Sequence, residues 1–115
     1  MRRLLLATAF CLATLPAAAQ LRDGVYEVEG TNPNGTTYTG ALQLRATPAG
    51  TWEALWAVGE LRIPGIGIIH AGVLSVAYLV DGRPGVASYE VRADGKLSGA
   101  WSMGTGMGTE VLTPR

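Results

Sequence analysis

Cysteine and histidine each occur only once in the 115 residues of the chain, as Cys11 and His70. A single cysteine cannot close a disulfide within the chain, and a single histidine does not supply the ligand set of a zinc site. No serine lies in a G-x-S-x-G setting that would pair it with His70 as a nucleophile with its base. We therefore expect no metal site, no cofactor and no catalytic centre, and we predict that the protein is not an enzyme.

Positive charge is not in excess either. The chain holds nine Lys and Arg against nine Asp and Glu, and residues 20–115 hold seven against nine, a formal charge of −2. Proteins that bind nucleic acids or anionic lipid surfaces carry basic patches, because these patches neutralise phosphate groups. The charge balance therefore predicts that nucleic acid is not a partner.

The first nineteen residues differ in composition from the rest of the chain. Met1-Arg2-Arg3 provides a basic start, residues 4–15 are almost entirely apolar, and Ala17-Ala18-Ala19 forms a small-residue cleavage site. This order is typical of a secretory signal peptide, and the apolar run is shorter than the roughly 20 residues of a membrane-spanning helix. We therefore expect a signal peptide over residues 1–19, a single domain over residues 20–115, and a secreted or periplasmic location.

Residues 20–115 contain no apolar stripe with the 3.6-residue period of a helix. Apolar and polar residues instead alternate with the period of a β-strand, and the alternating segments end at turn-forming pairs such as Asn34-Gly35 and Asp94-Gly95. The expected strands span residues 24–30, 37–46, 51–58, 60–69, 73–80, 85–92, 97–102 and 108–113. Eight short strands joined by short turns predict an all-β fold, an eight-stranded antiparallel up-and-down meander closed into a small barrel.

Some residues within these strands predict local departures from a flat, regular sheet. Pro64 lacks a backbone N–H, which predicts a bulge or an edge in the fourth segment. Inward-facing glycines predict bends and close backbone approach in a tightly curled sheet. These glycines are Gly40, Gly65, Gly67 and Gly99, and the alternative is that they mark sites where a ligand approaches the backbone.

The expected outer face also carries charge. Arg45, Glu53 and Arg92 fall on outward positions, whereas a membrane-spanning barrel has an apolar outside. We therefore expect no membrane insertion of the mature chain.

The inward positions hold most of the aromatic residues and one polar residue that is hard to place. The aromatic side chains either fill the barrel or line a pocket that is open at one mouth. If Leu112 points inward, so does Glu110, which then needs a donor such as a tyrosine hydroxyl, an indole N–H or Arg62. If Val111 points inward instead, Glu110 is solvated. The candidate pocket residues are Tyr26, Tyr38, Trp52, Trp56, Tyr89, Trp101 and Glu110.

A second candidate site lies on the outer wall. Residues 73–80 are apolar on both expected faces, and the irregular segment 60–69 adds outward isoleucines. An exposed apolar patch on a globular protein usually marks an interface, so a protein partner or self-association is expected there. The candidate interface residues are Ile66, Ile68, Leu74, Val76 and Tyr78.

A pattern of turn and core positions over nearly all of residues 20–115 resembles a family of small exported bacterial proteins, some of them labelled fibronectin-binding. It consists of Tyr26-x-Val28-x-Gly30-x-Asn32-Pro33-x-Gly35-x-x-Tyr38-x-Gly40, of Gly85-Val86-x-x-Tyr89-x-Val91-x-x-Asp94-Gly95-x-Leu97-x-Gly99-x-Trp101, and of Gly108-Thr109-Glu110-x-Leu112-Thr113. The architecture is also similar to avidin-like and lipocalin-like barrels and to periplasmic barrel inhibitors. None of their ligand-binding residues matches this chain position by position.

These observations lead to two hypotheses about function. The first is an exported, non-enzymatic binding protein, of adhesion or enzyme-inhibitor type, that uses its outer wall. The alternative is a carrier of a small apolar ligand with an aromatic-lined barrel mouth.

Overall fold

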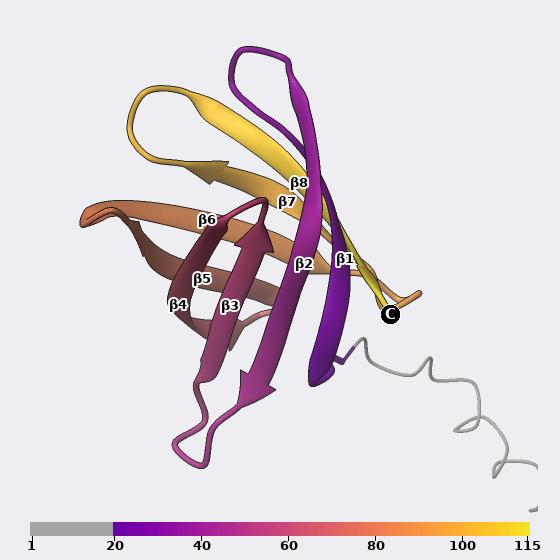
Figure 1. The fold of residues 1–115 in the computed structure, drawn as a ribbon. Helices are drawn as coiled ribbons and strands as arrows, with labels where there is room; N and C mark the ends of the chain where they lie inside the picture. Colours follow the sequence, from indigo (N-terminus) through magenta and orange to yellow (C-terminus); the bar gives the residue numbers. More distant parts are fainter. Residues whose placement is uncertain (1–19) are drawn as a thin grey trace, which may run out of the picture.

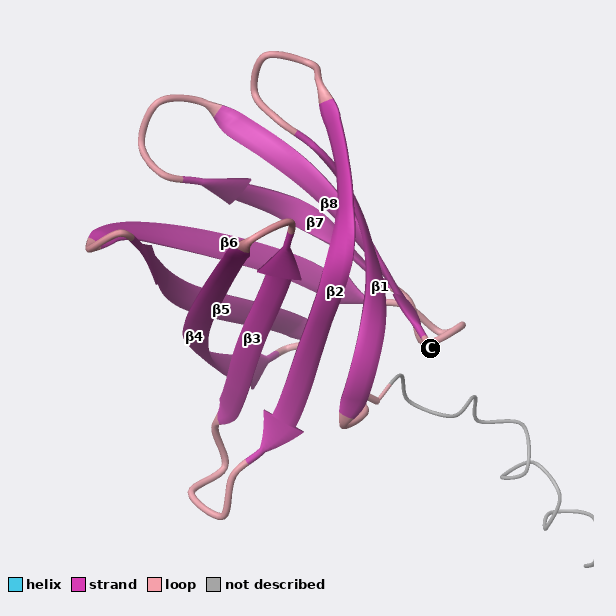
Figure 2. Cartoon of the chain, in the orientation of Figure 1, coloured by secondary structure: helices cyan, strands magenta, loops and turns pink. Residues whose placement is uncertain are grey.

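The computed structural model describes residues 20–115, which form eight β-strands and no helix (Figure 1 and Figure 2). The strands are β1 (Gly24–Thr31), β2 (Thr37–Ala46), β3 (Trp52–Val58), β4 (Leu61–His70), β5 (Val73–Val80), β6 (Arg83–Val91), β7 (Leu97–Ser102) and β8 (Met107–Pro114). Each strand pairs antiparallel with the next, and β8 also pairs with β1, which closes the barrel. The predicted eight-stranded up-and-down barrel is confirmed. The predicted signal peptide and its cleavage site lie outside the described residues.

Hairpin turns alternate between the two ends of the barrel. The β1–β2, β3–β4, β5–β6 and β7–β8 turns lie at one end, which we call the open end (Figure 1). The other three turns lie at the opposite end, the closed end, together with residues 20–23 and the C-terminus. The β4–β5 and β5–β6 turns are only two residues long, and both residues of each have positive φ, as in Ala71 at 54° and Gly72 at 79°. Such turns match the twist of the strands they join.

Alternation along each strand divides the side chains between the interior and the outer wall. All four tyrosines and all three tryptophans of the chain belong to the buried core or pack against it. The largest fully buried side chains include Tyr26, Tyr89, Leu42 and Leu112. Burying one such side chain stabilises a fold by roughly 1.5–3 kcal/mol. Because residues 20–115 contain no cysteine, this core and the closed ladder of backbone hydrogen bonds hold the domain together.

The fifth strand corrects one sequence-based prediction. Leu74, Val76 and Tyr78 point into the barrel and are buried, so they do not form an exposed patch on the outer wall. The outward positions of β5 are Ser75, Ala77 and Leu79 instead. The two-residue β5–β6 turn sets this choice, because it aligns Leu74 with Tyr89 on β6, and directly opposed residues share one face of a sheet.

Pro64 marks the edge that its missing N–H predicts. β4 pairs with β3 from Leu61 onward, but its pairing with β5 starts only at Gly65, opposite Tyr78. The first four residues of β4, Leu61–Pro64 in sequence order, therefore pair on one side only. The β3–β4 register runs past Pro64 without a bulge.

Inward-facing glycines let neighbouring strands come close together. A Cβ atom added at Gly40 would lie 2.5 Å from the carbonyl oxygen of Ala57, and one added at Gly65 would lie 2.9 Å from that of Ala77. At Gly99 it would collide with the carbonyl oxygen of Ser88. A small, strongly curled barrel needs such positions, as the sequence predicts.

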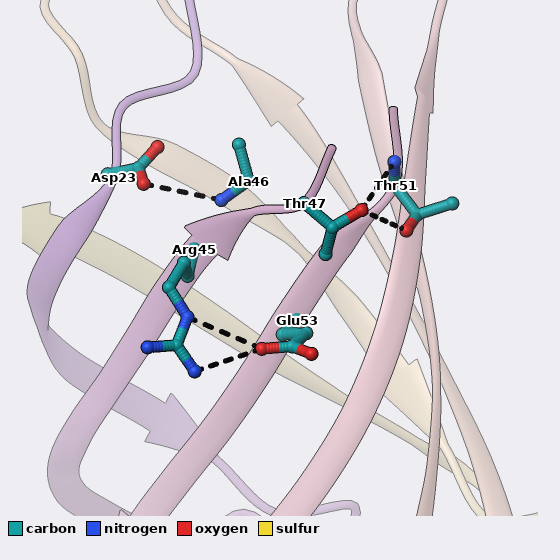
Figure 3. Close-up of polar contacts among 6 residues, drawn as sticks. All are labelled: Asp23, Arg45, Ala46, Thr47, Thr51 and Glu53. Atoms are coloured by element: carbon teal, nitrogen blue, oxygen red, sulfur yellow. Dashed lines mark hydrogen bonds and ion pairs between the residues drawn. The ribbon is translucent and has the colours of Figure 1, made fainter. Parts of the chain in front are cut away.

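The β2–β3 hairpin at the closed end is held by polar contacts (Figure 3). Arg45 donates two hydrogen bonds to Glu53 Oε1, of 3.3 and 3.0 Å, on the outer wall. Thr47 and Thr51 bridge the turn through their hydroxyl groups, 2.8 Å apart. The Arg45–Glu53 pair is largely exposed, and such pairs contribute at most about 1 kcal/mol. It helps to set the register of the hairpin and adds little to stability.

No helix long and apolar enough to span a membrane occurs in residues 20–115. Within the same residues, no group of three or more His, Cys, Asp or Glu side chains lies close enough together to hold a metal ion.

Candidate functional site

A cavity of about 240 Å³ lies inside the open end of the barrel. Five aromatic side chains from five different strands line it: Tyr38 on β2, Trp56 on β3, Tyr78 on β5, Tyr89 on β6 and Trp101 on β7. Aliphatic side chains complete the wall, and its rim includes residues of the turns at the open end. These further lining residues are Asn32, Val58, Leu61, Ile63, Val80, Ala87 and Met103.

Glu110 on β8 is the only charged residue that lines this cavity. Its side chain points inward, next to Leu112, and only 6% of its surface is exposed. The Tyr38 hydroxyl donates a 2.7 Å hydrogen bond to Glu110 Oε2, and the Tyr89 hydroxyl donates one of 2.7 Å to Oε1. Trp56 Nε1 makes a longer contact of 3.4 Å with Oε1.

The structure therefore selects the inward alternative for Glu110 and shows which donors it uses. They are two tyrosine hydroxyls and one indole N–H. Arg62, the third kind of donor considered from the sequence, donates to the backbone carbonyls of Gly59 and Leu61 instead.

The tyrosines around Glu110 stay protonated over an unusually wide pH range. Burial, and then the hydrogen bond and charge of Glu110, raise the pKa of Tyr38 far above its usual value. Burial and the Glu110 charge do the same for the pKa of Tyr89, and they raise the pKa of Tyr78 to about 12. At neutral pH all three hydroxyls are neutral, and those of Tyr38 and Tyr89 are hydrogen-bond donors to the carboxylate.

Three of the five wall aromatics are held in place by glycines on neighbouring strands. Tyr38 lies opposite Gly30, Tyr78 opposite Gly85, and Trp101 opposite Gly108. A Cβ atom added to any of these glycines would collide with the aromatic ring across from it. The rings therefore lie over the glycine backbone, an arrangement that fills the space left by a missing side chain. The glycines thus fix where these three rings lie inside the barrel.

Trp101 carries a polar atom that is not satisfied. Its Nε1 is buried and has no hydrogen-bond partner among the described residues. It lies close enough to Tyr38 to lower that tyrosine's pKa slightly against the larger upward effects, without forming a hydrogen bond of good geometry. The two rings meet edge to face, with centroids 6.4 Å apart. A buried N–H without a partner is costly, so this indole stabilises the fold less than a hydrogen-bonded one would.

Five of the seven predicted pocket residues line the cavity, and two do not. Tyr26 and Trp52 belong to the closed end, where Tyr26 donates a 2.7 Å hydrogen bond to the carbonyl oxygen of Arg22. Trp52 begins β3 and packs against the core. Sequence reasoning could not separate the two ends of the barrel. It also missed Tyr78, although pairing β5 with β6 through a two-residue turn would have placed it inward.

The two remaining predicted interface residues do lie on the outer wall. Ile66 is 68% and Ile68 57% exposed, and both border a shallow groove that crosses the outside of β4, β5, β6 and β7. Val86 and Met107 form further parts of its border, and small side chains such as Ala77 line its floor. None of the side chains that line this groove is charged.

Comparisons with known proteins extend the description of the fold. No family model matches the chain, and no curated protein matches its sequence. Among solved structures, the chain is similar to one described as "De novo design of a fluorescence-activating beta barrel", with 14% sequence identity and a TM-score of 0.59. The match covers 88% of this chain and 100% of the designed chain. At this level of identity the likeness concerns the fold alone, so the chain is similar to a small closed β-barrel.

Proposed function

We propose that the protein binds a small, largely apolar molecule in the cavity at the open end of its barrel. The observation that carries this proposal is an unfilled space of about 240 Å³ with aromatic walls and a hydrogen-bonded carboxylate on its lining. Protein interiors are normally packed as densely as organic crystals, and emptying a core is costly. A space of this size that combines apolar walls with one polar group is typical of a ligand site.

The size of the cavity limits the ligand. An engineered cavity of about 150 Å³ takes up benzene, whereas drug-sized ligands occupy roughly 300–1,000 Å³. The present cavity lies between these values. We therefore expect a ligand with on the order of ten non-hydrogen atoms.

Filling the cavity tests this proposal. Ala87 is buried on β6 and lines the cavity, so Ala87→Leu would occupy space that the ligand needs. Ala77 lies directly opposite Val86 on the neighbouring strand and faces outward, which makes Ala77→Leu a matched control. Binding is measured by isothermal titration calorimetry and by the emission of Trp56 and Trp101, with phenylpropanol as the probe.

The expected result is that the wild-type protein and Ala77→Leu bind the probe and Ala87→Leu does not. The tryptophan emission should shift on binding in the first two proteins only, because Trp56 and Trp101 lie in the cavity wall. Equal binding by all three proteins would place the probe elsewhere and would refute the proposed site.

The proposal includes export and a non-enzymatic role. The basic start, apolar run and small-residue site of residues 1–19 support export with cleavage after Ala19. Mass spectrometry of the protein recovered from the periplasm or the medium should give an N-terminus at Gln20. An intact N-terminus on a cell-associated protein would argue against this part of the proposal.

The outer groove supports a second candidate function, a contact with a protein partner or with another copy of the chain. Ile66, Ile68 and Val86 are more than half exposed around an uncharged groove, and exposed apolar patches usually mark interfaces. For self-association, light scattering coupled to size exclusion should give a dimer that Ile66→Lys disrupts. A wild-type monomer at high concentration would remove this version of the proposal.

A further inference from the structure

We infer that the ligand of the cavity is an organic cation, an apolar body that carries a protonated amine and directs it at Glu110. This inference rests on the proposed function, because it specifies the chemistry of a ligand in the same cavity. It follows from the partners of Glu110, from the absence of a compensating positive charge, from an unused acceptor position and from the aromatic walls.

The first step concerns the groups that face the carboxylate. Tyr38, Tyr89 and Trp56 all present hydrogen atoms to Glu110, and its two oxygens act only as acceptors. The indole N–H can only donate, and each tyrosine hydroxyl can donate or accept, so no group around Glu110 is an obligate acceptor that would require a carboxylic-acid proton. The surroundings therefore fit the ionised carboxylate, which places a negative charge on the cavity lining.

The second step is that this charge lacks a positive partner in the part of the chain that the structure describes. No Lys, Arg or His lines the cavity. The ion pairs among residues 20–115 join Arg45 to Glu53, Arg92 to Asp94 and Arg115 to Glu27, all on the surface. A buried charge without a counter-charge is unfavourable, and hydrogen bonds from neutral donors offset only part of this cost.

The third step is that the carboxylate has room for one more donor. A carboxylate oxygen can accept about two hydrogen bonds. Oε1 accepts from Tyr89 and Trp56, whereas Oε2 accepts from Tyr38 alone. An ammonium group that enters the cavity could donate to Oε2 and would supply the missing positive charge at the same time.

The fourth step concerns the walls. Trp56 and Tyr78 form a corner of the cavity, with ring centroids 5.4 Å apart and planes inclined at 59°, and Trp101 adds a second indole. The faces of aromatic rings carry partial negative charge and attract cations, and indole does so most strongly. The same walls remove water from the apolar body of the ligand. The cavity therefore offers a cation a carboxylate and several aromatic rings, whereas the carboxylate would repel an anion.

Three straight-chain phenylpropyl compounds test the inference, because they share an apolar body of the expected size and differ only in the head group. They are 3-phenylpropylamine, which is a cation at neutral pH, 3-phenylpropanol, which is neutral, and 4-phenylbutanoate, which is an anion. Binding of each is measured by calorimetry to the wild-type protein, to Glu110→Gln and to Glu29→Gln. Glu29 lies on the outer face of β1, so its variant loses the same charge outside the barrel.

The wild-type protein should bind the amine at least about tenfold more tightly than the alcohol, since charge-assisted hydrogen bonds are roughly twice as strong as neutral ones. The carboxylate compound should bind most weakly. Glu110→Gln should bind amine and alcohol equally, and Glu29→Gln should behave like the wild type. Circular dichroism checks that each variant is folded; if Glu110→Gln is not, the order of the three compounds on the wild-type protein decides by itself.

Different results refute different statements. Equal binding of amine and alcohol to the wild type would overturn the inference of a cationic ligand and leave the proposed binding function intact. A preference for the amine that persists in Glu110→Gln would overturn the role of Glu110. No binding of any of the three compounds would contradict the proposed function itself.

Discussion

The hydrogen bond between Tyr89 and Glu110 should contribute more to stability than a geometrically equal bond elsewhere in the barrel. Tyr89 and Tyr26 are both buried, with exposed fractions of 1% and 2%, and each donates a 2.7 Å hydrogen bond. The acceptor of Tyr89 is a carboxylate, whereas the acceptor of Tyr26 is the backbone carbonyl of Arg22. The variants Tyr89→Phe and Tyr26→Phe each remove one hydroxyl and keep the ring. The Tyr26 hydroxyl also accepts a 3.3 Å hydrogen bond from the Arg22 backbone N–H, so the comparison sets a charged partner against neutral backbone partners.

The expected magnitudes follow from the charge of the acceptor. A hydrogen bond to a charged group contributes about 1.5–3 kcal/mol, and one between neutral groups about 0.5–1.5 kcal/mol. Tyr89→Phe also leaves Glu110 Oε1 with only the 3.4 Å contact from Trp56. We therefore expect the free energy of unfolding to fall by about 2 kcal/mol in Tyr89→Phe and by about 1 kcal/mol in Tyr26→Phe.

Urea unfolding followed by circular dichroism measures both values. The dependence of the free energy on urea concentration should be the same in all three proteins, because the area exposed on unfolding is unchanged. In a domain of this size each kcal/mol corresponds to a shift in Tm of about 4–8 °C, so the two variants are easily distinguished. A loss in Tyr89→Phe that is no larger than the loss in Tyr26→Phe would refute the reasoning, because Glu110 would then not act as a charged acceptor.

Three further predictions address the tyrosines, one turn and one glycine. Burial and the Glu110 charge raise the pKa of Tyr78 from 10 to about 12, so the Tyr78 hydroxyl stays protonated to higher pH in the folded protein than in the unfolded chain. Ionisation of Tyr78 should thus leave the free energy of unfolding unchanged below pH 10 and lower it between pH 10 and 12, by about 1.4 kcal/mol per pH unit at most. In unfolding experiments at increasing alkaline pH, the free energy of unfolding should fall less steeply for Tyr78→Phe than for the wild type. An equal slope for both proteins would contradict the raised pKa of Tyr78. Ala71 has a φ of 54°, a conformation that is unfavourable for residues other than glycine. Ala71→Gly should therefore raise the free energy of unfolding, measured by urea titration, by about 0.5–1 kcal/mol. A loss of stability would show that the backbone at this turn is not strained. Gly108→Ala should lower the free energy of unfolding by roughly 1–3 kcal/mol and shift the tryptophan emission, because the new Cβ collides with the Trp101 ring. If both quantities keep their wild-type values, the ring is free to move away from the new Cβ.

The candidate site could be predicted from the sequence in part. The inward positions of Tyr38, Trp56, Tyr89 and Trp101 follow from strand alternation alone, because side chains on a strand change face at every residue. Glu110 remained ambiguous in the sequence, since both Val111 and Leu112 are apolar and either could have faced the core. The pairing of β8 with β1 and β7 resolves this ambiguity, because it places Glu110 opposite Gly30 and Gly99 on the inner face.

Strand β5 shows why apolar content alone does not identify a surface. Its sequence is apolar at both sets of alternating positions, so hydrophobicity could not decide whether Leu74, Val76 and Tyr78 lie inside. The register with β6 decides it. The Asp81-Gly82 pair predicts a tight turn, but it predicts the register of β5 with β6 only if the turn is assumed to be two residues long.

The sequence by itself determined the number of strands, the order in which hairpins join them and the absence of disulfides from residues 20–115, because period-two alternation and turn chemistry act between residues that are close along the chain. Only the tertiary structure decided where the aromatic side chains leave a cavity and which of them surround Glu110. Tyr38, Trp56 and Tyr89 lie 72, 54 and 21 positions from Glu110 in the sequence. Contacts between residues so far apart in the sequence depend on barrel closure and strand register. The residues next to them along the chain do not indicate which side chains will meet.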